Sequence, residues 1–242
     1  MTYTLKYHLY LLQTNSRSKD NPNSQVMVTN EINVSPKLVA TKTIHYYSGI
    51  IISVFVAVHL TNHLMLFQGE QAHIQFMATA RKFYRNIFIE TLLLTAVAVQ
   101  GISGIVLVAT KWNYRKTIFD KLHIYSGLYL AIFLTGHVLA VLAGRYVFKL
   151  DTNLYYGAGV LNNNPVYFFY FPYYALLIIS FFTHIACVHK MRVASYVSER
   201  QAARHAIGII ILGVLTALFI LYPMAQITIP PQYQIIPFGK YQ

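Results

Sequence analysis

The sequence predicts an all-α membrane protein, a bundle of five transmembrane helices with the N-terminus on the inner side of the membrane. The first observation is composition: 56% of the 242 residues are hydrophobic and only 11% are charged, whereas a soluble domain carries about 25% charged residues. The second is that the apolar residues fall in five long runs. Because lipid offers no hydrogen-bond partner to a free backbone, runs that cross a bilayer must be helical.

Each run approaches or exceeds the roughly 20 residues that cross about 30 Å of hydrocarbon. In chain order, the predicted spans lie near residues 44–66, 87–110, 122–143, 167–189 and 206–226. The mean hydropathy of the whole chain, +0.45, agrees with this multi-pass arrangement.

The remaining segments complete the predicted organisation. Residues 1–40 form a polar tail, residues 41–228 the five-helix transmembrane domain and residues 229–242 a short C-terminal tail. Two links are longer than the others, at 67–86 and 144–166, and the second, rich in Asn, is expected to be an ordered external loop.

Basic residues beside the spans predict the orientation, because cytoplasmic loops carry an excess of Lys and Arg. Ten lie on the side of the N-terminus and six on the other side: Lys37, Lys42, Lys111, Arg115, Lys116, Lys121, Lys190, Arg192, Arg200 and Arg204, against Arg81, Lys82, Arg85, Arg145, Lys149 and Lys240. The net charge of +12 thus reflects short flanking segments rather than a basic stripe interleaved with aromatic residues. We therefore expect no nucleic-acid partner.

One motif occurs twice. His-x-Tyr-Ser-Gly begins at His45 in the first span and at His123 in the third, and a further His follows in each, at His59 and His137. The two His of each span are fourteen residues apart, which on a helix gives about 1400° of rotation and a rise of about 21 Å. They therefore share one helix face at different membrane depths. Imidazole at such depth is costly and normally marks function.

The predicted orientation sorts these histidines into two layers, with His59 and His137 in the outer one and His45, His123 and His184 in the inner one. Two imidazoles on opposite faces of a b-type haem form a low-spin electron-transfer centre. We expect one haem b at His59 and His137. The sequence leaves open whether a second haem binds at the inner layer. Glycines that would let the macrocycle approach the backbone are Gly49, Gly101, Gly104, Gly127 and Gly136.

Other interpretations stay open at this stage. A single His in a span often serves as a hydrogen-bond donor between helices. His45 and His123, near the interface, also suit contacts to lipid, quinone or a haem propionate. Pairing His45 with His123 and His59 with His137 would follow the cytochrome b of bc complexes, which is a longer, eight-helix protein. The other histidines near the spans are expected to be bystanders: His63, His73 and His189.

The order of these features resembles the five-helix cytochrome b subunit of succinate:quinone oxidoreductases and quinol:fumarate reductases. In that family, the first and third spans carry a small hydroxyl residue plus Gly, with a haem-ligating His ten residues later. Ser48-Gly49 with His59 and Ser126-Gly127 with His137 match this pattern, and His184 matches a further His near the inner end of the fourth span. The resemblance covers about residues 42–226.

The chain departs from this family in its second span. Members with two haems place a His there as the partner of the His on the fourth span, and this chain has Gln100 at about that place. Three outcomes are open: the inner haem is absent, His184 pairs with His45 or His123, or Gln100 is a weak or indirect ligand.

Quinone reduction consumes protons, so a quinone site needs polar donors beside an apolar slot. Glu90 is the acid closest to an outer span end, and its alternative role is an ion pair with Arg85 or Lys82. Near the inner layer, Tyr46 and Tyr125 are candidate donors, together with Lys42, His45 and His123. By charge complementarity, haem propionates would suit the outer arginines: Arg81, Arg85 and Arg145.

The resemblance implies a haem-binding membrane anchor that passes electrons between iron–sulfur and flavoprotein subunits and membrane quinone. It implies an energy-transducing membrane, either the bacterial cytoplasmic or the mitochondrial inner membrane. The chain has no nucleotide fingerprint, no cysteine set for an iron–sulfur cluster and no Cys-x-x-Cys-His for covalent haem, so we expect the catalytic chemistry on partner subunits. The alternatives are a free-standing transmembrane b-type cytochrome and a haem-free structural subunit of a respiratory complex.

Overall fold

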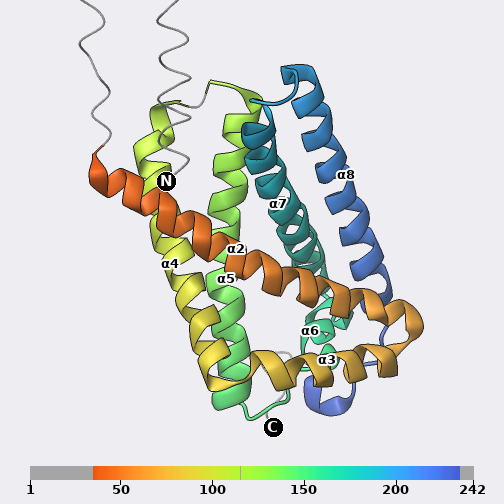
Figure 1. Ribbon diagram of the computed structural model, residues 1–242. Coiled ribbons are helices and arrows are strands. Elements are labelled where there is room, and N and C mark those ends of the chain that lie inside the picture. Colours follow the sequence, from red (N-terminus) through yellow and green to blue (C-terminus); the bar gives the residue numbers. More distant parts are fainter. Residues whose placement is uncertain (1–34, 115, 235–242) are drawn as a thin grey trace, which may run out of the picture. The chain divides into compact units, whose positions relative to one another are not determined.

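The computed structural model describes residues 35–114 and 116–234 (Figure 1). Most of the predicted N-terminal tail and the end of the C-terminal tail lie outside the described residues. The described residues from Ala40 onward belong to one compact unit.

The described residues fold into helices and contain no strand. The elements in chain order are α2 (Pro36–Leu64), η2 (Met65–Gln68), α3 (Glu70–Tyr84), α4 (Ile87–Lys111), η3 (Trp112–Tyr114), α5 (Ile118–Tyr146), α6 (Leu154–Gly159), η4 (Val160–Asn162), α7 (Tyr167–Val193), α8 (Glu199–Met224) and η5 (Pro231–Tyr233). Five of them, α2, α4, α5, α7 and α8, are long and apolar enough to cross a membrane. The predicted all-α class is confirmed, and five helices capable of crossing a membrane lie where the sequence predicts spans.

Two helices begin before the predicted apolar runs, because capping residues stabilise their polar first turns. Thr117 and Asp120 form a capping box at the start of α5, and Ser198 and Gln201 form one at the start of α8. Each box satisfies backbone N–H groups that would otherwise lack partners. These two helices therefore begin four and seven residues before the predicted spans at 122 and 206.

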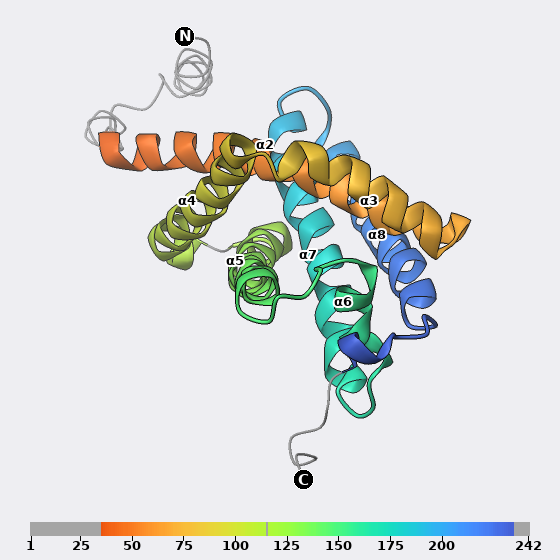
Figure 2. The ribbon, with the colours of Figure 1, turned by 90° about the horizontal axis from the view of Figure 1, so that it is seen from below.

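Four helices, α4, α5, α7 and α8, stand side by side, and α2 crosses them obliquely (Figure 1). Seen from below, α2 and α3 lie along one side of these four (Figure 2). Close backbone packing joins α7 to α8, α5 to α7 and α4 to α5, whereas α2 meets the bundle mainly through side chains. The 33 residues of Pro36–Gln68 give about 50 Å of helix, which is enough to cross the hydrocarbon when tilted.

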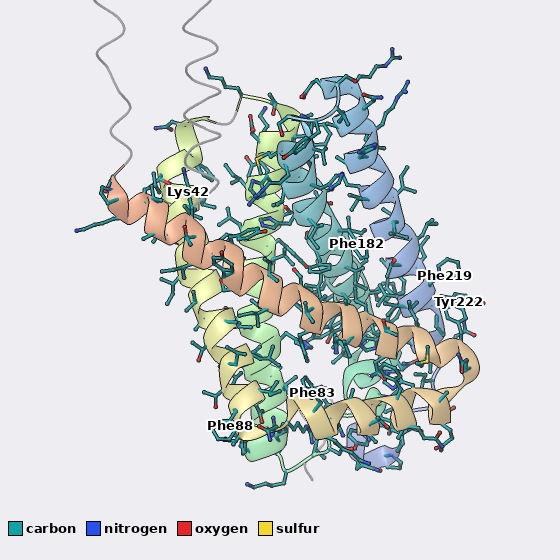
Figure 3. All side chains as sticks on the ribbon, in the orientation of Figure 1. Lys42, Phe83, Phe88, Phe182, Phe219 and Tyr222 are labelled. Carbon is teal, nitrogen blue, oxygen red and sulfur yellow. The ribbon has the colours of Figure 1, made fainter. Side chains whose placement is uncertain are left out.

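The densest packing lies between α7 and α8. A side-chain Cβ on Gly213 of α8 would sit 2.5 Å from Cβ of Phe182 on α7 (Figure 3), so only glycine admits this approach. By contrast, Phe219 and Tyr222 of α8 project outward, at 54% and 70% exposure. Such apolar exteriors are expected where a helix faces lipid.

The two longer links contain helices that the sequence analysis did not predict. The link at 67–86 holds the amphipathic helix α3, which buries His73 and Met77 one turn apart. The link at 144–166 holds α6, whose Leu154 and Ala158 belong to the buried core around α7 and α8. Both segments therefore pack against the spans.

Candidate functional site

The structure gathers the histidines near the spans into two clusters. The His59 cluster consists of His59 and His63 on α2, His73 on α3 and His137 on α5, and the His45 cluster consists of His45 on α2, His123 on α5 and His184 on α7. The five candidate ligands thus fall into the two groups expected from their depths. His63 and His73 join the first group.

His59 and His137 face each other between α2 and α5. Their ring centroids are 6.1 Å apart and their planes make an angle of 63°. Two imidazoles that bind one metal ion from opposite sides have centroids about 6 Å apart, because each metal–nitrogen bond is about 2.0 Å and each nitrogen lies about 1.1 Å from its ring centre. The separation of this pair fits two ligands of one iron.

A phenylalanine one turn earlier on the same helix supports each of these rings. Phe55 stacks on His59 at 5.8 Å and 15°, and Phe133 stacks on His137 at 5.6 Å and 17°. Residues four apart share a helix face, so the stacking follows from the spacing. Both phenylalanines stand ten residues after the first His of their motif, so the repeat extends further than the sequence analysis recognised.

His63 and His73, which were expected to be bystanders, belong to the same cluster as this pair. His63 Nε2 is 3.3 Å from His59 Nε2, and the rings of His63 and His73 are 5.4 Å apart. The spacing of His59 and His63, one helical turn, could have revealed the first contact. Nothing in the sequence signals the second, because His73 lies in a polar segment and is buried only by the docking of α3.

The side of the His59 cluster next to α3 holds buried polar groups. His73 is 1% exposed, and its Nε2 lies 3.2 Å from Nδ2 of Asn62. Burial, with a smaller contribution from the charge of Arg81, lowers the pKa of His73 to about 4. Among the described residues, four buried atoms lack a hydrogen-bond partner, and all belong to this region: Asn62 Oδ1, His63 Nδ1, His73 Nδ1 and Arg81 Nε.

A small cavity adjoins His59 between α2 and α3. Its volume is about 10 Å³, and its lining includes Asn62, Met77 and Tyr84. A cavity of this size is at the lower limit for one water molecule.

In the His45 cluster, His184 is the central ring. Its centroid is 6.4 Å from that of His45, with an interplanar angle of 71°, and 4.5 Å from that of His123, with an angle of 39°. The first separation is close to the distance expected for two ligands on opposite sides of one metal ion, and the second is too short for that arrangement.

Polar residues of α2 and α4 surround His45. Gln100 Nε2 lies 3.1 Å from His45 Nε2, and Ser103 Oγ lies 3.0 Å from His45 Nδ1. Ser48 Oγ donates to Gln100 Oε1 at 2.6 Å. Gln100, which occupies the place of the expected second-span ligand, is therefore held by Ser48 and contacts His45 directly.

Glycines allow the rings of the His45 cluster to approach neighbouring helices. A Cβ on Gly104 would lie 3.3 Å from Cε1 of His45, and a Cβ on Gly127 would lie 3.1 Å from Cε1 of His184. Of the other glycines expected near ligands, Gly49 faces Gln100, whereas Gly101 has no such neighbour within 4 Å.

Three arginines and two carboxylates lie at the end of the bundle near the His59 cluster. Glu90 pairs with Arg145 of α5 rather than with the expected Arg85 or Lys82. Arg81 pairs with Asp151 at 2.7 Å. Arg85 donates to Thr152 Oγ1 at 3.1 Å, and burial together with the charges of Arg81 and Arg145 lowers its pKa. The three arginines and two carboxylates together carry one excess positive charge, which suits an anion.

The candidate quinone residues Tyr46 and Tyr125 lie at the opposite end and are 42% and 53% exposed. The guanidinium of Arg192 lies 4.7 Å from the ring centre of Tyr46. A cavity of about 50 Å³ beside His123 is lined by residues that include Asp120 and Lys190. Polar donors and one small cavity therefore lie near the His45 cluster.

The donor set limits what these clusters can bind. Within residues 35–114 and 116–234, no three His, Cys, Asp or Glu side chains are arranged to hold a metal ion. A pair of opposed imidazoles can supply two axial ligands when a macrocycle supplies the remaining ones, as in b-type haem. The pairs fit that group better than a bare metal ion.

Comparison of the chain with known protein families, with curated proteins and with solved structures found no match.

Proposed function

We propose that the protein is a haem b-binding membrane anchor subunit of a respiratory complex II-type enzyme. In this proposal, it passes electrons between iron–sulfur and flavoprotein subunits and membrane quinone, in a bacterial cytoplasmic or mitochondrial inner membrane. The observation that carries the haem assignment is the separation of 6.1 Å between the rings of His59 and His137. The anchor role rests on the resemblance of motif order and spacing.

The residues of the chain have distinct tasks in this proposal. His59 and His137 hold the iron from two helices, and Phe55 and Phe133 fix the planes of their rings. The haem, when bound, supplies a one-electron redox centre whose potential depends on its axial ligands and surroundings. Arg85 offers the excess positive charge for a propionate.

The exposed polar residues near the His45 cluster suit the quinone step. Tyr46 beside Arg192 offers a hydroxyl at the surface of the bundle, and Tyr125 offers another. Glu90 is less suited, because the guanidinium of Arg145 already holds its carboxylate in an ion pair. Quinone protonation in this proposal therefore belongs to the end of the bundle that carries Tyr46.

Affinity purification from native membranes tests the anchor role. A tag on this chain should bring down flavin and iron–sulfur subunits, detected by fluorescence of bound flavin and by electron paramagnetic resonance. A purified chain that carries haem b but no flavin or iron–sulfur cluster would instead identify a free-standing cytochrome. A chain with its partners but without haem would identify a structural subunit.

A further inference from the structure

We propose that the end of the bundle near the His59 cluster binds the headgroup of an anionic phospholipid. This site, the Lys82 patch, takes its charge from Lys82 and Lys149 and its apolar contacts from exposed aromatic side chains beside them: Phe83, Phe88 and Phe148. The proposal goes beyond the proposed function, because lipid binding here needs neither haem nor a partner subunit.

The basic residues on the predicted outer side gather at one place. Within residues 35–114 and 116–234, all of them lie at this end of the bundle: Arg81, Lys82, Arg85, Arg145 and Lys149. They come from two segments far apart in the chain, which the ion pairs of Arg81 with Asp151 and of Arg145 with Glu90 bring together. Because the side opposite the cytoplasm is normally poor in basic residues, such a group indicates an anionic partner.

Positive charge remains in this group after its ion pairs are counted. Arg81 and Arg145 are paired with carboxylates, and the proposed function offers the charge of Arg85 to a propionate. In the part of the chain that the structure describes, neither Lys82 nor Lys149 has a carboxylate partner, and both are exposed. These two lysines therefore supply charge for a second anion.

Large apolar side chains beside the lysines favour a lipid over a soluble anion. Phe83 and Phe88 lie at the end of the bundle where α3 is followed by α4 (Figure 3), and Phe88 is 82% exposed. Phe148, next to Lys149, is exposed as well. Exposed aromatic residues next to lysine are typical of the level at which headgroups meet acyl chains. A soluble phosphate would contact the lysines but not the phenylalanines.

The chemistry of these side chains defines the class of lipid. Lysine ammonium groups donate charge-assisted hydrogen bonds to phosphate oxygens. Near a membrane surface, each lysine strengthens binding to anionic lipid by about fivefold. The ligand is therefore a phospholipid with a net negative charge, such as phosphatidylglycerol, and zwitterionic phosphatidylcholine should bind more weakly.

Native mass spectrometry of the purified protein in an uncharged detergent tests the proposal, with dioleoyl phosphatidylglycerol as the titrated lipid. The double variant Lys82→Gln/Lys149→Gln should bind this lipid about 30-fold more weakly than the unchanged protein. The matched control is Lys121→Gln/Arg200→Gln, which removes two exposed positive charges near the starts of α5 and α8, at the opposite end of the bundle. The control should bind as the unchanged protein does.

Four outcomes would overturn the proposal. Equal weakening in both double variants would show a general attraction between charges. Equal affinities of the unchanged protein for phosphatidylglycerol and dioleoyl phosphatidylcholine would show that charge does not select the lipid. Binding of soluble glycerol 3-phosphate as tight as that of the lipid would assign a soluble anion. A loss of haem from Lys82→Gln/Lys149→Gln with unchanged lipid binding would assign the lysines to the haem.

An acidic protein surface is the other occupant that the charge would fit. In native membranes, a photoactivated cross-linker attached to Lys149→Cys in a Cys187→Ser background should react with lipid. A cross-link to a polypeptide, including a second copy of this chain, would overturn the proposal. Neither this experiment nor the lipid titration depends on haem, so their outcomes are separate from those that test the proposed function.

Discussion

At the scale of single residues, the surroundings of an imidazole decide its role more than its presence in a span. His59 and His137 oppose each other at the separation of two ligands, whereas His73 is enclosed by Asn62, His63 and Arg81. A ligand histidine needs a free lone pair, and an enclosed one is simply kept neutral by burial. The histidines near the spans therefore differ in their surroundings despite their shared chemistry.

The docking of α3 should depend on pH through His73. Its pKa is about 4 in the folded protein, below the ordinary value of 6.5, so the unfolded segment takes up the proton first as the pH falls. The docking free energy is complete above about pH 6.5 and should fall by roughly 1–2 kcal/mol by pH 5. Hydrogen exchange of the α3 amides, corrected for intrinsic rates, measures this loss of protection.

His73→Gln provides the control for that experiment, because an amide can still bond Asn62 but does not titrate. Protection of α3 in this variant should be nearly independent of pH between 7.5 and 5. Equal loss of protection in the variant and the unchanged protein would show that another group controls the docking.

At the scale of elements, the helices differ in how they are held. α7 and α8 pack through small residues and close backbone approach, while α2 is held by side-chain contacts such as Ser48 to Gln100 and Phe55 to Tyr84. Without a hydrophobic force between helices in lipid, close packing and interhelical hydrogen bonds drive association. Among these spans, α2 is therefore the one that depends most on side-chain contacts.

The packing of α7 on α8 should fail when Gly213 gains a side chain. In Gly213→Ala, the new Cβ would lie 2.5 Å from Cβ of Phe182 and 2.8 Å from its Cγ. Overpacking of this kind costs about 1–3 kcal/mol. Thermal unfolding in detergent should show a lower midpoint for this variant.

Gly208→Ala on the same helix is the matched control, because nothing lies within 4 Å of a Cβ there. Its midpoint should be unchanged or higher, since Ala favours a helix over Gly by up to about 1 kcal/mol. Similar losses in both variants would refute the close approach at Gly213.

At the scale of the whole molecule, composition and apolar runs were enough to predict the five spans. The oblique course of α2 was not predictable, because the runs carry no information on tilt, and this course decides that His45 approaches His184. α3 and α6 were missed because each is short and only partly apolar. His73 was missed with α3, since a single His in a polar segment gains its burial from tertiary contacts alone.

The orientation stays a prediction of the sequence, and cysteine labelling tests it. In a Cys187→Ser background, Lys121→Cys and Lys149→Cys place single thiols near opposite ends of α5, at two exposed positions. A membrane-impermeant maleimide added to right-side-out vesicles should label the cysteine at position 149 and spare the one at 121. The reverse pattern would place the N-terminus outside.

The most direct test of the central assignment is a dithionite-reduced minus oxidised spectrum of the purified protein, compared with that of His137→Ala. We expect the α-band of a low-spin b-type haem in the unchanged protein. The band of the His59–His137 haem should be lost from the variant, which should still insert and fold. An unchanged spectrum in His137→Ala, or no haem band in the unchanged protein, would contradict it.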